Sequence, residues 1–164
     1  MAHDIVIRGG LLVDGTGWEP VRGDLAIADG VITAVGEVES SSRRALDRYL
    51  PAPLPREQRQ GTLHVPHVQP EPRRAARSAC EPARIIGLSD RGILAPGMRA
   101  DVNVFDPEPV SERPPEIAPD FPGGAPRFLS RSRGYRATIV NGQVSVLEGE
   151  HTGARARTVL RHPR

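Results

Sequence analysis

His64, His67 and Cys80 form the one cluster in this sequence whose residue types are those of metal ligands. A hydrolytic zinc ion needs three protein ligands and one open position, all held rigidly. The spacing of His64 and His67 would place both on one face of a helix, but Pro66 lies between them and breaks a helix. We therefore interpret both histidines as linker residues, with weak metal affinity of the linker as the alternative, and predict no metal ligand.

The other histidines and hydroxyl groups do not combine into a nucleophilic site. His3, His151 and His162 are far apart and close to chain ends or turns, and His151 is expected to lie exposed in a loop. Thr16 and Ser89 have no histidine nearby in the sequence to activate their hydroxyl groups. The sequence therefore predicts no catalytic residue.

Four charged residues in the second half of the chain favour a structural role. Asp90 and Arg91 are expected to pair with each other or with neighbours at the surface. Asp101 and Asp106 bracket a predicted strand. There they would cap the strand rather than form a carboxylate pair for acid–base chemistry.

All 22 basic side chains among the 164 residues are arginine. Without lysine there is no Schiff base and no phosphate-binding Gly-x-x-x-x-Gly-Lys loop. Gly9-Gly10 and Gly123-Gly124 are therefore read as turns, and no cofactor-binding residue is predicted. The single Cys80 permits no intrachain disulfide, and neither a signal peptide nor a long apolar window is present, so we expect a cytoplasmic protein without a membrane partner.

Charge is concentrated in the middle of the chain. Residues 41–84 hold nine arginines and four acidic residues, whereas residues 1–40 hold two arginines and seven acidic residues. Such a basic segment could contact nucleic acid or an anionic membrane. Tyr49 is its one aromatic residue and no basic helical face is evident, which favours a solvated linker and makes nucleic acid an unlikely partner.

The first 39 residues have the pattern of four short strands. DIVIR and LLVD flank Gly9-Gly10, DLAIA and VITAVG flank Asp29-Gly30, and both dipeptides favour two-residue hairpin turns. Leu25 and Ile27 share one face of their strand. Trp18, in the connection between the two hairpins, is expected to cap the edge of the sheet.

The pattern changes after residue 39. Residues 40–72 are rich in Arg and Pro, and we predict a disordered linker with at most a helical turn near Ala45–Leu50. Residues 73–88 predict two short helices, or one that begins near Glu81-Pro82. Residues 107–126 form a Pro-rich loop.

Three more strands are predicted beyond the linker. One spans Asp101 to Phe105, and Asn141-Gly142 joins the strands ATIV and QVSVL in a hairpin. A lone hairpin is marginal in water, so both chain ends should pack into one composite β-sandwich of about seven strands, a mostly β fold with one or two short helices and a disordered middle. The boundaries are 1–39 and 73–153 for the two halves, 40–72 for the linker and 154–164 for a flexible tail.

Five motifs carry a family resemblance. These are DIVIRGGLLVDGTG, DLAIADGVITAVG, PARIIGLSDRGILAPGMRADVNVFDP, FPGGAPR and TIVNGQV followed by GEHTG. They resemble the two ends of the amidohydrolase superfamily, specifically its N-acyl-D-amino-acid deacylase (D-aminoacylase) and dihydroorotase-like members. The resemblance implies a small β-sandwich beside a TIM-like barrel, one or two zinc ions, and hydrolysis of amide or related non-peptide C–N bonds.

The sequence departs from that family where its chemistry resides. The family's PGFxDxHxHxD motif, which supplies two metal ligands, has no counterpart, and no His-x-His occurs. A TIM-like barrel needs roughly 200 residues, far more than the linker holds. We therefore expect a barrel-deleted, non-catalytic protein without a zinc cofactor. The alternatives are a sandwich module that binds a full-length amidohydrolase or a copy of itself, and an Arg-rich linker that contacts nucleic acid.

Overall fold

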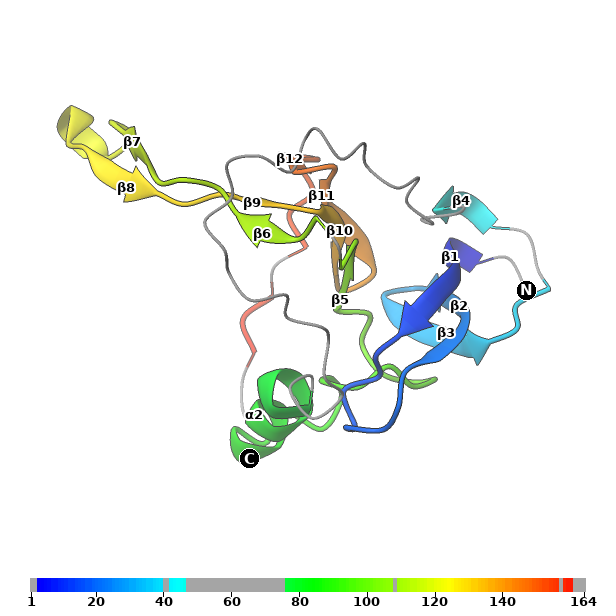
Figure 1. The fold of residues 1–164 in the computed structure, drawn as a ribbon. Helices are drawn as coiled ribbons and strands as arrows, with labels where there is room; N and C mark the ends of the chain where they lie inside the picture. The colour runs from blue at the N-terminus through cyan, green and yellow to red at the C-terminus, as the bar shows by residue number, and fades with distance from the viewer. Residues whose placement is uncertain (1–2, 40–41, 47–75, 108, 157, 161–164) are drawn as a thin grey trace.

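The structure is a computed structural model that describes residues 3–39, 42–46, 76–107, 109–156 and 158–160. Most of the Arg- and Pro-rich middle lies outside these residues, so its predicted disorder stays a prediction. Figure 1 shows two sheets side by side, a short helix below them and a thin hairpin that projects to one side.

The N-terminal residues form a four-stranded sheet. Its strands are β1 (His3–Leu12), β2 (Val21–Ala28), β3 (Val31–Gly36) and β4 (Ser42–Leu46), in the order β3-β2-β1-β4. β1, β2 and β3 are antiparallel neighbours, and β4 is parallel to β1. The register sets Ile5 opposite Ile27 and Ile7 opposite Leu25, so the alternating apolar residues of two strands share one face.

Three predictions for this sheet are corrected and one is confirmed. Gly9-Gly10 is not a hairpin: β1 continues through it, with Gly9 at φ +62° inside a bulge of the β1–β2 pairing. Residues 45 and 46 belong to β4 and not to a helical turn. Trp18 is 78% exposed and covers little of the sheet edge. The Asp29-Gly30 turn between β2 and β3 is confirmed, with positive φ at both residues.

The C-terminal half forms the second sheet. Its strands are β5 (Val102–Phe105), β10 (Tyr135–Val140), β11 (Gln143–Leu147) and β12 (Glu150–His151), in the order β12-β11-β10-β5. All neighbours are antiparallel. Asn141 and Gly142 both have positive φ between β10 and β11, which confirms this hairpin.

The two sheets share one hydrophobic core. Ile139 on β10 is as deeply buried as Ile27 on β2, at 1% and 0% exposure. The core consists of Ile5, Ile7, Leu25, Ile27 and Ile32 from the N-terminal sheet and Ala100, Ala137, Ile139 and Val144 from the C-terminal half. Neither sheet buries its apolar face alone, so the predicted composite sandwich is confirmed.

A short helical segment precedes the second sheet. A π-helical turn, η2 (Ala76–Cys80), runs directly into α2 (Glu81–Ile85), with Pro82 in the first turn of α2. Proline is tolerated there because the first N–H groups of a helix have no intrahelical acceptor. The prediction of two short helical pieces within residues 73–88 is confirmed for the described residues 76–85. No helix in the described part of the chain has the length and hydrophobicity needed to cross a membrane.

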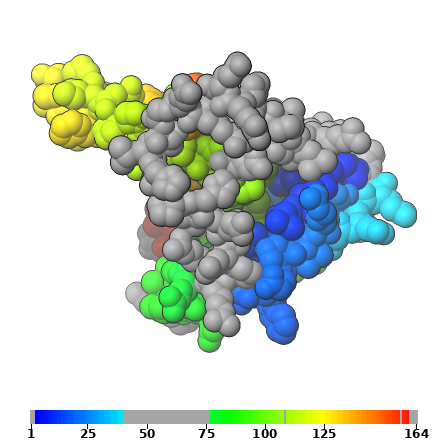
Figure 2. Space-filling view, in the orientation of Figure 1, coloured from blue at the N-terminus to red at the C-terminus, as the bar shows by residue number. Residues whose placement is uncertain are grey.

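Residues 107–126 are predicted as a loop, but residues 111–126 of this segment lie in a projecting hairpin. We call residues 111–133 the arm. It contains β6 (Ser111–Glu112), β7 (Glu116–Ala118), the 3₁₀ turn η3 (Pro122–Gly124), β8 (Arg127–Leu129) and β9 (Ser132–Arg133). β6 pairs with β9 and β7 with β8. The prolines fall between these short strands, where no ladder hydrogen bond is lost, and Figures 1 and 2 show the arm standing away from the sandwich.

Candidate functional site

Two hairpin turns from opposite halves of the chain pack directly on each other. A Cβ atom added at Gly142 would lie 2.6 Å from the Cα of Gly30, and one added at Gly30 would lie 2.9 Å from the carbonyl oxygen of Asn141. Ala100 joins the turns: its N–H donates to Gly30 (3.0 Å), and its carbonyl accepts from the N–H of Gly142 (3.0 Å). Only glycine permits both the positive φ and this close approach.

Backbone hydrogen bonds extend this contact along β3. Ile32 donates to the carbonyl of Met98 and accepts from the N–H of Gly97, both at 2.8 Å. In the connection between β1 and β2, the carbonyl of Asp14 accepts a hydrogen bond from the N–H of Leu94 at 2.8 Å. The segment before β5 is therefore bonded to the N-terminal sheet. The two halves are joined by a row of backbone bonds in addition to the apolar core.

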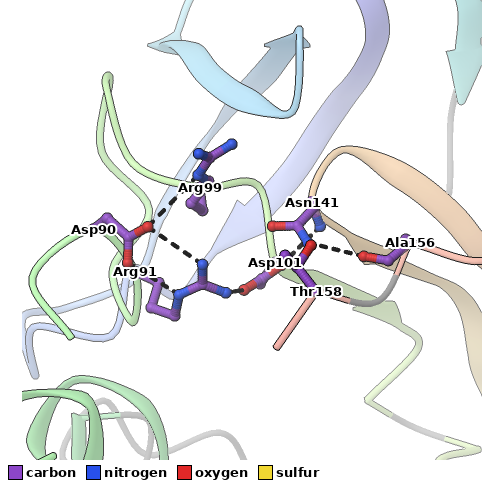
Figure 3. A network of polar contacts seen from close by, with 7 residues as sticks. All are labelled: Asp90, Arg91, Arg99, Asp101, Asn141, Ala156 and Thr158. Carbon is purple, nitrogen blue, oxygen red and sulfur yellow. Dashed lines mark hydrogen bonds and ion pairs between the residues drawn. The ribbon is translucent and has the colours of Figure 1, made fainter. Parts of the chain in front are cut away.

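A polar network lies beside the joined turns (Figure 3). The guanidinium of Arg91 donates to Asp90 (3.0 Å) and to Asp101 (2.6 Å). The second oxygen of the Asp101 carboxylate accepts from the backbone N–H of Asn141 at 2.8 Å. The amide nitrogen of Asn141 donates to the carbonyl of Ala156 at 2.9 Å. The network thus ties the loop before β5 to the β10–β11 turn and to the C-terminal segment.

The charges in this network stabilise one another. The hydrogen bond from Arg91 holds the pKa of Asp90 below its ordinary value, and the same bond raises the pKa of Arg91. The Arg91 side chain is 13% exposed, so its two carboxylate partners replace most of its solvation. Asp90 therefore stays ionised near neutral pH, which suits an ion pair and not a general acid.

A shallow groove of about 320 Å³ opens on this network. It is lined by Asp90, Arg91, Arg99, Asn141, Gln143, Arg155, Ala156, Thr158 and Leu160. Arg99 lies 3.5 Å from Asp90, and its side chain is 46% exposed. The groove is thus polar, with three arginines and one aspartate on its walls.

The charged residues singled out from the sequence take the predicted structural places. The pairing of Asp90 and Arg91 with each other and with neighbours is confirmed. Asp101 and Asp106 lie at either end of β5. Asp101 joins the polar network, whereas Asp106 is 6% exposed and its backbone N–H donates to Gly134 at 2.8 Å. The structure therefore does not bring the two carboxylates together as an acid–base pair.

The described candidates His3, His151, Cys80, Thr16 and Ser89 are not members of this network. His3 on β1 contacts the hydroxyl of Thr33 through Nδ1 at 3.0 Å. His151 is exposed, as predicted, but in the edge strand β12 and not in a loop. Cys80 is half-buried at the end of η2. Thr16 donates to Asp14 at 2.7 Å in a turn, and Ser89 is exposed.

The possible metal ligands lie partly inside and partly outside the residues that the structure describes. In the ranges that the structure describes, no three His, Cys, Asp or Glu side chains gather as metal ligands, so these residues do not fit the zinc of the family. His64, His67 and His162 lie outside the described residues. The interpretation of the HVPH motif as linker therefore stays a prediction.

Sequence reasoning missed the side-chain role of Asn141. The Asn-Gly dipeptide indicated a turn, but nothing local indicated that the amide would hold residue 156. That contact depends on the return of a segment fifteen positions later. Arg99 and Arg155 were likewise not singled out, because the groove arises only when distant segments meet.

Comparison with known proteins identifies part of the chain. Residues 76–146 match the amidohydrolase family. Over 27% of its length the chain is 41% identical to N-acyl-D-glutamate deacylase from Bordetella bronchiseptica, whose crystal structure was solved with zinc and a phosphonate inhibitor that mimics the tetrahedral intermediate. The matched part is 10% of that enzyme's chain and the TM-score is 0.27, so the likeness of the backbones carries no argument. No curated protein is significantly similar to the chain. The match over residues 76–146, which are less than half of the chain, confirms the resemblance to the amidohydrolase family found in the sequence.

Proposed function

We propose that this chain is an amidohydrolase-type β-sandwich that works as a binding module and does not itself hydrolyse a substrate. One observation carries the proposal: residues from both sides of the linker fill a single core. Only residues 47–75 separate β4 of the N-terminal sheet from η2, whereas a metal-binding barrel needs roughly 200 residues. In such barrels the catalytic groups stand at the ends of barrel strands, so a chain without those strands has no place for them.

The arm supports a role in binding. Ile117 and Phe128 lie opposite each other across β7 and β8, and they are 68% and 77% exposed. Phe121, near the tip, is 52% exposed and lies under the guanidinium of Arg127 at 5.5 Å. Large apolar side chains that cluster on a projecting element favour contact with another protein. The partner proposed is another amidohydrolase chain, either a full-length relative or a copy of this one.

Hydrolysis and metal content test the first half of the proposal. Purified full chain, shown to be folded by a cooperative thermal transition, is incubated with zinc and N-acyl-D-amino acids, N-acetyl-D-glutamate among them. We expect no release of free amino acid above the protein-free control and no stoichiometric zinc after dialysis. Release of amino acid by protein that retains about one zinc ion per chain would refute the proposal.

Co-elution tests the second half. Size-exclusion chromatography with light scattering is run on the chain alone and after mixing with a full-length amidohydrolase. We expect the chain in a complex in at least one of the two runs, and a weaker complex for the double variant Ile117→Ser/Phe128→Ser. A clean monomer in both runs would contradict a binding role.

A further inference from the structure

The groove beside the joined turns contains two arginines with donor capacity that the other described residues do not use. Arg91 is not one of them, because its guanidinium already binds Asp90 and Asp101. Arg99 makes one ion pair, with Asp90, at 3.5 Å. Charge-assisted hydrogen bonds are shorter, about 2.7–2.9 Å. Since Asp90 is already bound by Arg91 at 3.0 Å, Arg99 is a secondary partner and retains donors for a further acceptor.

Arg155 makes fewer ion pairs with described residues than Arg99 does. Its side chain is exposed, and no ion pair joins it to another residue in the described ranges. Its backbone is nevertheless anchored, because the neighbouring Ala156 is 8% exposed and accepts the hydrogen bond from Asn141. Arg155 is therefore a charged side chain that extends from a fixed point on the groove wall.

The rest of the lining suits a small polar ligand. Gln143 and Thr158 add neutral hydrogen-bonding groups, and Leu160, 48% exposed, adds one apolar patch. The volume of about 320 Å³ is at the small end of the range for ligand pockets, about 300–1,000 Å³. With Arg91 neutralised by its carboxylate partners, Arg99 and Arg155 leave the groove basic.

We propose that this groove binds a compact oxyanion, a phosphate or carboxylate group of a small molecule, between Arg99 and Arg155. The planar guanidinium presents paired N–H donors that match the oxygens of either group. Ionised Asp90 repels an anion from its own side of the groove, so the ligand lies toward Arg155 and Gln143. The site uses none of the family's metal chemistry, and it does not depend on whether the module binds another protein.

Titration of the full chain with inorganic phosphate, and separately with succinate, tests the proposal. Binding is followed by NMR shifts or by a saturable rise in the thermal midpoint, at physiological ionic strength. We expect saturation with at least one of the two anions. The anion that saturates identifies the group, because phosphate is tetrahedral and succinate carries planar carboxylates.

Matched arginine variants locate the site. Arg155→Gln should weaken binding roughly ten-fold or more, the loss expected for a charge-assisted hydrogen bond. Arg22→Gln, a change of the same charge at an exposed position on β2, should leave it unchanged. If Arg99→Gln fails to fold, anion binding by Arg155→Gln still tests the proposal, because the Arg155 side chain makes no ion pair with another described residue. No saturation with either anion, or equal losses in Arg155→Gln and Arg22→Gln, would overturn the proposal.

Discussion

The contact between the two turns makes a quantitative prediction for Gly142→Ala. At φ +73° an alanine pays a backbone cost of roughly 1–2 kcal/mol. Its Cβ would also lie 2.6 Å from the Cα of Gly30, a backbone atom that cannot move aside alone. Overpacking of this kind adds about 1–3 kcal/mol. We expect a total loss of about 2–5 kcal/mol in the free energy of unfolding.

Gly149→Ala is the matched control. Gly149 has a similar φ of +85°, in the turn between β11 and β12, but an added Cβ there meets nothing within 4 Å. Only the backbone cost of roughly 1–2 kcal/mol applies to it. The difference between the two variants therefore measures the packing of the N-terminal half on the C-terminal half.

Urea unfolding, monitored by circular dichroism, gives both free energies. The Gly142→Ala variant should be less stable than Gly149→Ala by at least about 1 kcal/mol. In thermal unfolding of a chain of this size, that difference corresponds to a thermal midpoint lower by roughly 2–4 °C. Equal stabilities of the two variants would refute the reasoning, because the turns would then not be in contact and the composite core would be in doubt.

Three further predictions concern the core, the ion-pair network and the arm. Ile139→Ala should cost about 2–5 kcal/mol in urea unfolding, whereas Ile85→Ala, at a position that is 84% exposed, should change stability by less than about 0.5 kcal/mol; similar losses would contradict the assigned core. Because the pKa of Asp90 is lowered in the folded state, its pairing with Arg91 stabilises the fold above the ordinary carboxyl pKa of 3.8, and this stabilisation disappears as the pH falls through the lowered value. The thermal midpoint of Arg91→Gln, measured from pH 6 downward, should therefore fall less steeply below about pH 4 than that of the wild type. Parallel curves for the two proteins would count against the ion pair. Replacement of residues 113–131 by Asn-Gly joins β6 to β9 through a two-residue turn and should leave cooperative unfolding intact, since no arm residue belongs to the core; loss of the thermal transition would show that the arm supports the sandwich.

The parts of the fold that the sequence predicted are those encoded by local signals. Asp29-Gly30 and Asn141-Gly142 each specify a tight turn through positive φ, and both form as expected. The alternating apolar residues around them define the faces that meet in the core. The composite sandwich follows from these signals, since the apolar faces of the two halves are buried against each other in one core.

The predictions that failed depend on contacts between distant segments. Gly9 permits either a turn or a bulge, and the pairing of β1 with β2 along its whole length selects the bulge. β4 has no strand signal of its own and forms by parallel pairing to β1. In the arm, prolines argue against a continuous strand, but they do not prevent ladders of two or three residues between them.

The same distinction applies to the site. The pairing of Asp90 with Arg91 is a neighbour effect and was predictable from the sequence. The link from Asp101 to Asn141 spans 40 positions, and the groove requires a third segment from the end of the chain. The described histidines and Cys80, which residue type marks as possible metal ligands, do not line this groove. Its lining contains three arginines, and the sequence shows Arg99 and Arg155 only as part of the overall charge.

The length of the connection between the two halves has only a small effect on the stability of the sandwich. Its two halves are joined by core packing and by backbone bonds such as those between Ile32 and residues 97 and 98, all made within the sandwich. The entropy cost of closing the connection between the halves rises by only about 0.6 kcal/mol for each doubling of its length. Between flexible connections, shortening from roughly 200–300 residues to residues 47–75 is a change of about three doublings, so the shorter connection favours the sandwich by roughly 2 kcal/mol. A short connection between β4 and η2 therefore does not by itself reduce the stability of the sandwich.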